Sequence, residues 1–376
     1  MKYMGSKRAM LGNGLGELLG KEVLTANRFV DLFTGSAAVA AHVGQRFDLP
    51  VFAFDLQNYS AVLANAIIGR NSTFEWESTC DRWHKRAENF VRQIKIPEID
   101  KVTKKAVAQH REWCEEQHDL PITKAYGGHY FSPLQAVWID ALRAKLPSTE
   151  PARTVALASL IQAASQSAAA PGHTAQPFQP TKTAKPFLAD AWKREIPTRV
   201  RSGFEALAGQ CAKRIGGSRV ADANDAAEEL VEGDLVFLDP PYSGVHYSRF
   251  YHVLETIAQG KCGEVSGVGR YPAPILRPSS SYSVSSESTT ALDGLLKTIS
   301  SRGARAILTF PNHECSNGLS GESVREISGK YFQVKEKIVK SKFSTMGGTG
   351  NAQRNGEGAR SARQHADELI LVLRPQ

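Results

Sequence analysis

Alternating strand and helix patterns at residues 28–68 constrain the fold of this chain more than any other feature. An apolar strand pattern at 28–33 leads through a tight turn into a helix of small residues at 37–43. A second strand pattern at 50–55 leads into a helix at 58–68 with apolar residues at helical spacing. Consecutive units of this kind favour a parallel sheet with right-handed crossovers. We therefore predict an α/β fold with helices on both faces of the sheet.

The strand–helix pattern stops at about Trp76 and returns after about residue 200. Charged helical segments and a loop rich in proline and glycine, 168–185, fill the stretch between. The predicted helices of this stretch are 82–94, 102–116, 133–146 and 153–167. The predicted later elements are strands at 218–221, 235–238, 304–310 and 368–373 and a helix at 225–230. The sequence thus predicts a domain of residues 1–75 and 201–376 that is interrupted by an inserted domain of residues 76–200.

Composition and cysteine usage narrow the class of protein. The chain has 376 residues, 41% of them hydrophobic, without an apolar run long enough to span a membrane or an N-terminal secretion signal. We therefore expect a cytoplasmic protein. The cysteines are scattered and form no Cys-x-x-Cys pair, which argues against a disulfide framework and against a zinc site, so that no metal is expected. They are Cys80, Cys114, Cys211, Cys262 and Cys315.

The net charge of +8 and the pI of about 9.2 are compatible with a polyanionic partner but do not require one. Lysines and arginines gather at 82–105, and lysines gather again at 330–342. Each cluster fits contact with nucleic acid, and each fits equally the solvated face of a helix or strand.

A rigid polar turn follows the apolar strand 235–238. It consists of Asp239-Pro240-Pro241-Tyr242. The acid lies at the carboxyl end of a strand, where open α/β sheets build their ligand sites, and the prolines fix the backbone and remove two N–H donors. The Asp239 carboxylate and the Pro240 carbonyl can accept hydrogen bonds from the amino group of a flat base, on which the Tyr242 ring can stack. The alternative is a proline turn without a binding role.

The turn after the first strand has the features of a nucleotide site. Gly35 allows close approach of the backbone, and the following helix presents free N–H groups. Asp31 and Phe33 precede the glycine, Ser36 follows it, and Asp55 ends the next strand, where doubly wound folds hold ribose hydroxyls. The alternative for Asp31 is an N-capping or turn-forming carboxylate, and the alternative for Asp55 is an N-cap of the following helix. NAD and ATP are disfavoured because the later glycines and the phosphate-binding lysine of their motifs are missing.

Three runs in order resemble the Dam-type (alpha-class) adenine-N6 DNA methyltransferases. They are Met1–Lys7 with its Gly5-Ser6-Lys7, Asp31–Ser36, and, after a long insert, Asp239–Tyr242. The resemblance covers residues 1–75 and 200–376. It implies a Rossmann-like sheet that uses S-adenosylmethionine, with the insert as the target-recognition domain.

The resemblance also implies roles for further residues. Tyr3 and Lys7 would lie near the methionine part of the cofactor, and Asp222 or Asp225 beside its adenine, although either acid is equally a helix N-cap. The family usually has a second glycine where Ala37 stands, which puts the affinity for the cofactor in doubt.

The implied reaction is methyl transfer to an adenine that is flipped out of double-stranded DNA. Asp239, which faces both cofactor and substrate, and the Pro240 carbonyl would accept from the amino group and aim its nitrogen at the methyl group. Tyr242 would stack on the base. Neither a metal nor a covalent enzyme intermediate is required.

Contacts to DNA are expected from the insert and from two loops. The insert carries glutamines, which can bind base edges, and lysines, which bind bases or phosphates. Core packing is the alternative for the aromatic residues after the Asp239 turn, and a surface loop is the alternative for 347–363. A Ser-rich segment, 278–290, is expected to be a loop. The candidate residues are Gln176, Gln179, Lys182, Arg249, Tyr251 and Arg354.

Other functions remain open at this stage. The same acceptors would bind the amino group of cytosine, so cytosine-N4 methylation is an alternative. RNA adenine or glutamine methylation is less favoured, because those relatives usually carry Asn in place of Asp239. A non-catalytic DNA-binding protein of the same fold is the alternative outside enzymes. Partners would be double-stranded DNA and, in a restriction–modification system, a cognate endonuclease; neither the target sequence nor the oligomeric state follows from the sequence.

Overall fold

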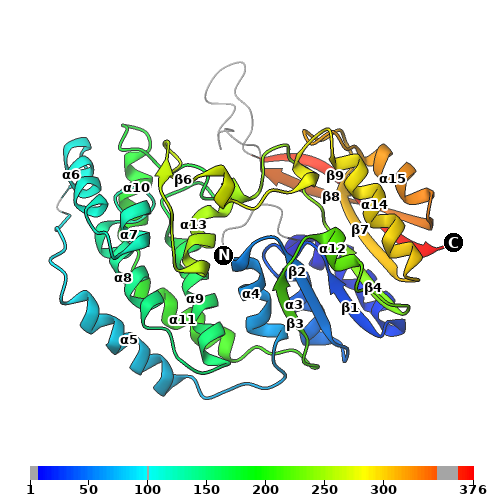
Figure 1. Ribbon diagram of the computed structural model, residues 1–376, viewed down its shortest axis with the longest axis horizontal. Helices are drawn as coiled ribbons and strands as arrows, with labels where there is room; N and C mark the ends of the chain where they lie inside the picture. Colours follow the sequence, from blue (N-terminus) through cyan, green and yellow to red (C-terminus); the bar gives the residue numbers. More distant parts are fainter. Residues whose placement is uncertain (1–6, 100, 345–362) are drawn as a thin grey trace. The chain divides into compact units, whose positions relative to one another are not determined.

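The computed structural model describes residues 7–99, 101–344 and 363–376 (Figure 1). The chain forms two compact units. The helical unit comprises residues 57–218 and 247–278. The sheet unit comprises Arg219–His246, Ser279–Gln376 and the residues from Met4 to Leu56. The predicted insert of residues 76–200 lies within the helical unit, which also includes residues on both sides of it.

A seven-stranded sheet with the order β3-β2-β1-β4-β7-β9-β8 forms the centre of the α/β part (Figure 1). Strand β1 pairs in parallel with β2 and β4, and β4 pairs in parallel with β7. The strands are β1 Arg28–Asp31, β2 Val51–Asp55, β3 Gly217–Val220, β4 Asp234–Leu238, β7 Arg305–Pro311, β8 Phe332–Ser344 and β9 Arg363–Pro375. The predicted α/β, Rossmann-like fold is confirmed.

The last two strands do not continue the parallel pairing predicted from the strand–helix units at 28–68. Strand β9 runs antiparallel to both β7 and β8, so this side of the sheet is mixed. Strand β8 itself was not predicted, because Lys335, Lys337 and Lys340 interrupt its apolar pattern and point to solvent. Lysines are typical of an edge strand, where they discourage pairing with another chain. The exposure of these three lysines fits both alternatives for the cluster at 330–342, and nucleic-acid contact there stays a prediction.

Buried apolar strands and the helices beside them form the core of the sheet unit. All five residues of β4 are buried, and Val236 and Leu238 belong to one cluster with Leu292 and Leu295 of α14 and Leu371 of β9. Continuous apolar runs of this kind are typical of strands covered on both faces. The helices of this unit are α1 Arg8–Met10, α2 Gly16–Glu22, α3 Ala38–Arg46, α12 Ala223–Ala227, α14 Ser288–Ser301 and α15 Gly321–Gly329.

The Ser-rich segment 278–290 is not a loop throughout. Tyr282 is 1% exposed within a short 3-10 helix, Ser281–Ser283, and α14 begins at Ser288. The tyrosine hydroxyl donates to Asn224 Oδ1 at 2.7 Å, which anchors this segment to α12. The prediction of a loop was therefore wrong for these residues, because the serine content masked one buried aromatic anchor.

The helical unit is stabilised by helix capping and by close helix contacts. Ser132 and Gln135 form a capping box at the start of α8, and Pro133 occupies its first turn. The indole of Trp83 in α5 donates to the Leu142 carbonyl of α8 at 2.9 Å. Helices α11 and α9 pack against each other at Gly203, where the nearest side-chain atom to a Cβ built on the glycine is Ser159 Cβ at 3.4 Å.

The elements of the helical unit include all four helices predicted for the insert. They are α4 Asn58–Ile68, α5 Glu77–Val91, α6 Lys104–Glu115, α7 Pro121–Tyr126, α8 Pro133–Ala144, α9 Ala152–Ser167, α10 Lys185–Trp192, α11 Ile196–Ala208, α13 Ser248–Gln259 and the hairpin β5 Val265–Ser266 with β6 Tyr271–Pro272. Within the described residues, no helix is both long and apolar enough to cross a membrane.

Candidate active site

Three acids predicted from the sequence lie at the carboxyl ends of neighbouring parallel strands. Asp31 ends β1, Asp55 ends β2, and Asp239 follows β4 directly. The register pairs Asp31 with Phe237 of β4 and with Ala53 of β2, so the three strand ends meet at one edge of the sheet. Open α/β sheets bind their ligands at this edge.

The turn after β4 is held from two sides. The hydroxyl of Thr309 in β7 donates to Asp239 Oδ1 at 3.0 Å. The side-chain amide of the fully buried Asn317 donates to the Pro241 carbonyl at 2.8 Å. Among the described residues, no hydrogen bond to the Pro240 carbonyl occurs, so this oxygen is free to accept from a ligand. The two anchors fix the acid and leave the neighbouring acceptor open.

Aromatic side chains border this edge of the sheet. Tyr242 and Phe33 are half-buried, and both pack against the core of the sheet unit. The Phe33 ring meets the Tyr282 ring edge to face, with centroids 5.1 Å apart. Both predicted aromatic residues therefore combine a packed side with a partly exposed one, as stacking on a flat ligand requires.

Lys7 forms a buried ion-pair cluster with two carboxylates. Its ammonium lies 2.9 Å from Asp239 Oδ1 and 2.6 Å from Glu368 Oε1, and the side chain is 5% exposed. Burial alone would lower the pKa of Lys7, but the charges of Asp239 and Glu368 outweigh this effect and raise the pKa above its ordinary value. Lys7 is therefore a permanent cation against the carboxylate at the end of β4.

The pKa values of the two acids at the ends of β1 and β4 are both raised. Burial raises the pKa of Asp31 to about 8, and the charges of Asp239 and Asp55 add to the rise. Burial also raises the pKa of Asp239, although the Lys7 ammonium opposes this rise. Asp31 is thus largely protonated at neutral pH, and its charge responds to any cation that binds beside it.

The turn between β1 and α3 has a left-handed backbone. Gly35 has a φ of 52°, and Ala37 has a φ of 60°. Asp55 Oδ2 accepts from the Gly35 N–H at 2.8 Å, and the Thr34 hydroxyl donates to the Phe54 carbonyl at 2.9 Å. In this structure Asp55 therefore holds the turn after β1 rather than capping the helix that follows it, which begins after Gln57. Its role toward a ribose stays a prediction.

We expect Ala37→Val to lower the free energy of unfolding by about 2–4 kcal/mol, since a β-branched side chain is strained at positive φ and the site is buried. Ala38→Val, one residue later in the helix, should cost about 1 kcal/mol or less. Urea unfolding of the two variants measures the difference. Equal losses would contradict a left-handed Ala37.

The comparison with known proteins agrees with this site. Residues 3–270 match the D12 class N6 adenine-specific DNA methyltransferase family. The chain belongs to this family. The resemblance predicted from the three runs is therefore confirmed.

Two curated relatives of this chain are modification methylases. Modification methylase StsI of Streptococcus sanguinis is 23% identical over 323 residues, which cover 83% of this chain and 44% of the relative. Type II methyltransferase M.FokI of Planomicrobium okeanokoites is 25% identical over 296 residues, which cover 71% of this chain and 38% of the relative. The chain thus spans less than half the length of either protein.

The adenine-side acids predicted from the family lie at the start of α12. Asp222 is half-buried and caps this helix, because its Oδ1 accepts from the Asn224 N–H at 2.8 Å. Asp225 is exposed in the first turn. The N-cap alternative describes the contact that Asp222 makes here, and contact of either acid with a cofactor stays a prediction.

Five of the six candidate DNA contacts of this family member lie on the helical unit. Arg249 is exposed, and its guanidinium stacks over the Tyr271 ring at 4.7 Å. Gln176 and Lys182 are exposed, whereas Gln179 is half-buried and accepts from Arg111 at 3.2 Å. The other two candidates, Tyr3 for the cofactor and Arg354 for DNA, lie outside the described residues.

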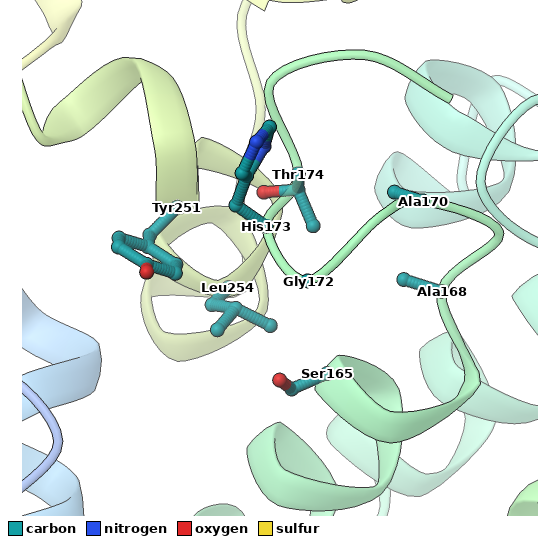
Figure 2. A pocket seen from close by; sticks show the side chains of 8 residues that line it. All are labelled: Ser165, Ala168, Ala170, Gly172, His173, Thr174, Tyr251 and Leu254. Carbon is teal, nitrogen blue, oxygen red and sulfur yellow. The ribbon is translucent and has the colours of Figure 1, made fainter. Parts of the chain in front are cut away.

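The prediction that Tyr251 contacts DNA was wrong, because its side chain is buried. It is 1% exposed in α13, and its ring centroid lies 5.7 Å from that of Tyr59. It also lines a small cavity together with Ser165, His173 and Leu254 (Figure 2). The cavity volume of about 10 Å³ suffices for about one water molecule and is too small for a base. Core packing, the alternative considered for this residue, describes Tyr251.

Sequence reasoning missed three residues that support the site. Thr309 and Asn317 fix the turn after β4, and Glu368 binds Lys7. None of them belongs to a short motif. The one available signal was Glu368, a carboxylate at the start of the otherwise apolar run predicted as a strand at 368–373.

Proposed function

We propose that this chain transfers a methyl group from S-adenosylmethionine to the N6 amino group of an adenine in double-stranded DNA. The observation that carries the proposal is the Asp239 carboxylate, held by Lys7 and Thr309 at the end of β4 beside the turn that follows β1. Membership of the family supports the choice of adenine.

The residues at the strand ends carry the kinds of polar and aromatic groups that would bind an adenosine-type cofactor. Asp31, Phe33, Gly35, Ser36 and Asp55 would hold it, with the glycine at positive φ and the acids at two neighbouring strand ends. When bound, S-adenosylmethionine supplies an activated methyl group on a sulfonium. The buried Asp31, with its raised pKa, would bind a cationic part of the cofactor by releasing its proton. Contacts of Tyr3, Lys7 and Asp222 or Asp225 with the cofactor belong to the same proposal.

The residues after β4 would hold the substrate amine. Lys7 and Thr309 both reach Oδ1 of Asp239, and no other polar contact to this carboxylate occurs among the described residues. Oδ2 and the Pro240 carbonyl could then accept the two amino protons, while the Tyr242 ring stacks on the base. On methylation the amino nitrogen would become positively charged as the sulfonium loses its methyl group and becomes a neutral thioether. The Asp239 carboxylate would stabilise that charge until one amino proton is released to solvent. Flipping the base out of the duplex costs a few kcal/mol.

We propose that the helical unit selects the target sequence. Arg249, Gln176 and Lys182 are exposed and carry groups that bind phosphates or base edges. Gln179 requires release from Arg111 before its amide can bind a base. The names of the two modification methylases support a place in a restriction–modification system, with a cognate endonuclease as partner. Independence from metals and a cytoplasmic location stay predictions.

Cytosine-N4 methylation is the second candidate, because the same acceptors bind any exocyclic amine. Methylation-sensitive long-read sequencing of DNA from cells that express the chain tests both. We expect N6-methyladenine in one sequence context and none in cells that express the Asp239→Ala variant. N4-methylcytosine in the modified context would replace adenine by cytosine as the substrate, and unmodified DNA would contradict the proposed function.

A further inference from the structure

Glu368 lies next to the proposed chemistry but belongs to none of the motifs that led to it. It sits on β9, where it pairs with Pro311 of β7 on one side and with Val339 of β8 on the other. Its side chain is 13% exposed, and its Oε1 lies 2.6 Å from Lys7 Nζ. The same ammonium lies 2.9 Å from Asp239 Oδ1, so one cation bridges carboxylates from two different strands.

The cluster carries more negative charge than a structural ion pair needs. Lys7 and Asp239 alone would neutralise each other, and a second buried carboxylate adds a desolvation cost. With Glu368 ionised, the two carboxylates and one ammonium leave the cluster with one surplus negative charge. Such a surplus opposes folding but favours a reaction whose transition state is cationic.

The position of Glu368 also fixes where Lys7 points. The ammonium is drawn to Oδ1 of Asp239 from the side of β9, and Thr309 donates to the same oxygen. Without Glu368, nothing among the described carboxylates would hold the flexible lysine on this side of Asp239. It could then swing onto the oxygen that the substrate amine needs.

We propose that Glu368 is a positioning residue for methyl transfer: it holds Lys7 on one oxygen of Asp239, keeps the other oxygen open for the amino group, and supplies the surplus negative charge of the site. The inference rests on the proposed function. Glu368 acts through Lys7 and does not touch the substrate.

The decisive variant is Glu368→Gln, which keeps the shape of the side chain and removes its charge. We expect kcat to fall about 10–100-fold while KM for DNA and for S-adenosylmethionine changes less than about threefold. Asp367→Asn is the matched control, because it removes a carboxylate at the adjacent, exposed position of the same strand. Its kcat should stay within about twofold of the wild type.

A pH profile separates positioning from a merely structural role. The groups that act on the Asp239 carboxylate are Lys7, Glu368 and Thr309, with Asp31 close by and Tyr242 near Lys7. Because the charge of Glu368 raises the pKa of Asp239, Glu368→Gln should move the acid limb of kcat to lower pH. Glu368→Asp keeps the charge and should restore the acid limb and most of the rate.

The outcomes distinguish the inference from the function on which it rests. An active wild type together with a glutamine variant of unchanged kcat overturns the role of Glu368. So does a slower glutamine variant with an unmoved acid limb and a lowered melting temperature, since that result shows a structural role. An aspartate variant as slow as the glutamine variant overturns the charge argument. A wild type that methylates no DNA overturns the proposed function instead.

Discussion

Asp239→Asn is expected to lower kcat by about 10²–10³-fold, the range seen when one charge-stabilising group of an active site is removed. The asparagine keeps the shape of the side chain and one carbonyl oxygen, but it loses the negative charge that is proposed to stabilise the methylated amino nitrogen. Single-turnover methylation of a duplex with the target site, followed with labelled S-adenosylmethionine, measures the loss.

Binding and stability serve as controls for this variant. Calorimetry with S-adenosylmethionine and gel-shift titration with DNA should give Kd values within a few-fold of the wild type. The melting temperature should not fall, because Lys7 keeps Glu368 as its partner at 2.6 Å. Full activity of Asp239→Asn would rule out the role assigned to this carboxylate, and lost activity with lost folding would leave no support for it.

Lys7→Met is expected to lower the free energy of unfolding by about 3–5 kcal/mol at pH 8, the usual cost of removing one partner from a buried ion pair. The methionine fills a similar volume but leaves Asp239 and Glu368 as two buried carboxylates without their cation. Burial raises the pKa of Asp239, and without the Lys7 ammonium nothing opposes this rise. The loss should therefore be largest at high pH and should shrink as the pH falls and Asp239 takes up a proton.

Two further variants control this experiment. Arg8→Met replaces the neighbouring exposed cation and should change the stability by about 0.5 kcal/mol or less. The double variant with Lys7→Met and Glu368→Gln should recover part of the loss, because only one unpaired carboxylate remains. If Lys7→Met were as stable as Arg8→Met at pH 8, the buried cluster would not form in solution.

The strand ends of the site could be predicted because residues close in sequence identify them. Each of Asp31, Asp55 and Asp239 follows an apolar run within a few residues, and the parallel arrangement of such runs brings their ends together. The pattern identifies the acids, the edge of the sheet and the turns between them without any knowledge of distant contacts.

The cluster around Lys7 could not be predicted in the same way. Lys7 and Glu368 are 361 positions apart, and no periodicity relates residues at such a separation. Strand β9, which carries Glu368, left an apolar signal at 368–373, but its partner β8 has lysines along much of its length, so the antiparallel pair itself could not be predicted. Which carboxylate meets the lysine depends on the register of this pair.

At Tyr251, by contrast, the local sequence pattern led to a wrong prediction. The aromatic and basic run 247–252 fits a surface that binds bases, but it folds largely as the start of α13. Only Arg249 and Tyr247 of that run keep appreciable exposure, whereas Phe250 and Tyr251 face the interior. Successive residues of α13 from Phe250 to Ala258 are all buried, so its packing among other elements, and not a local pattern, decides which side chains reach solvent.

The amide of Asn317 has a mechanical consequence for the sheet unit. Its two N–H groups hold the carbonyls of Pro241 and Tyr282 at 2.8 and 2.9 Å. The Tyr282 ring in turn rests against Phe33, beside the turn after β1. One buried side chain thus connects the turn after β4, through Tyr282, to an aromatic ring beside the turn after β1. A displacement of one turn would therefore strain contacts that hold the other.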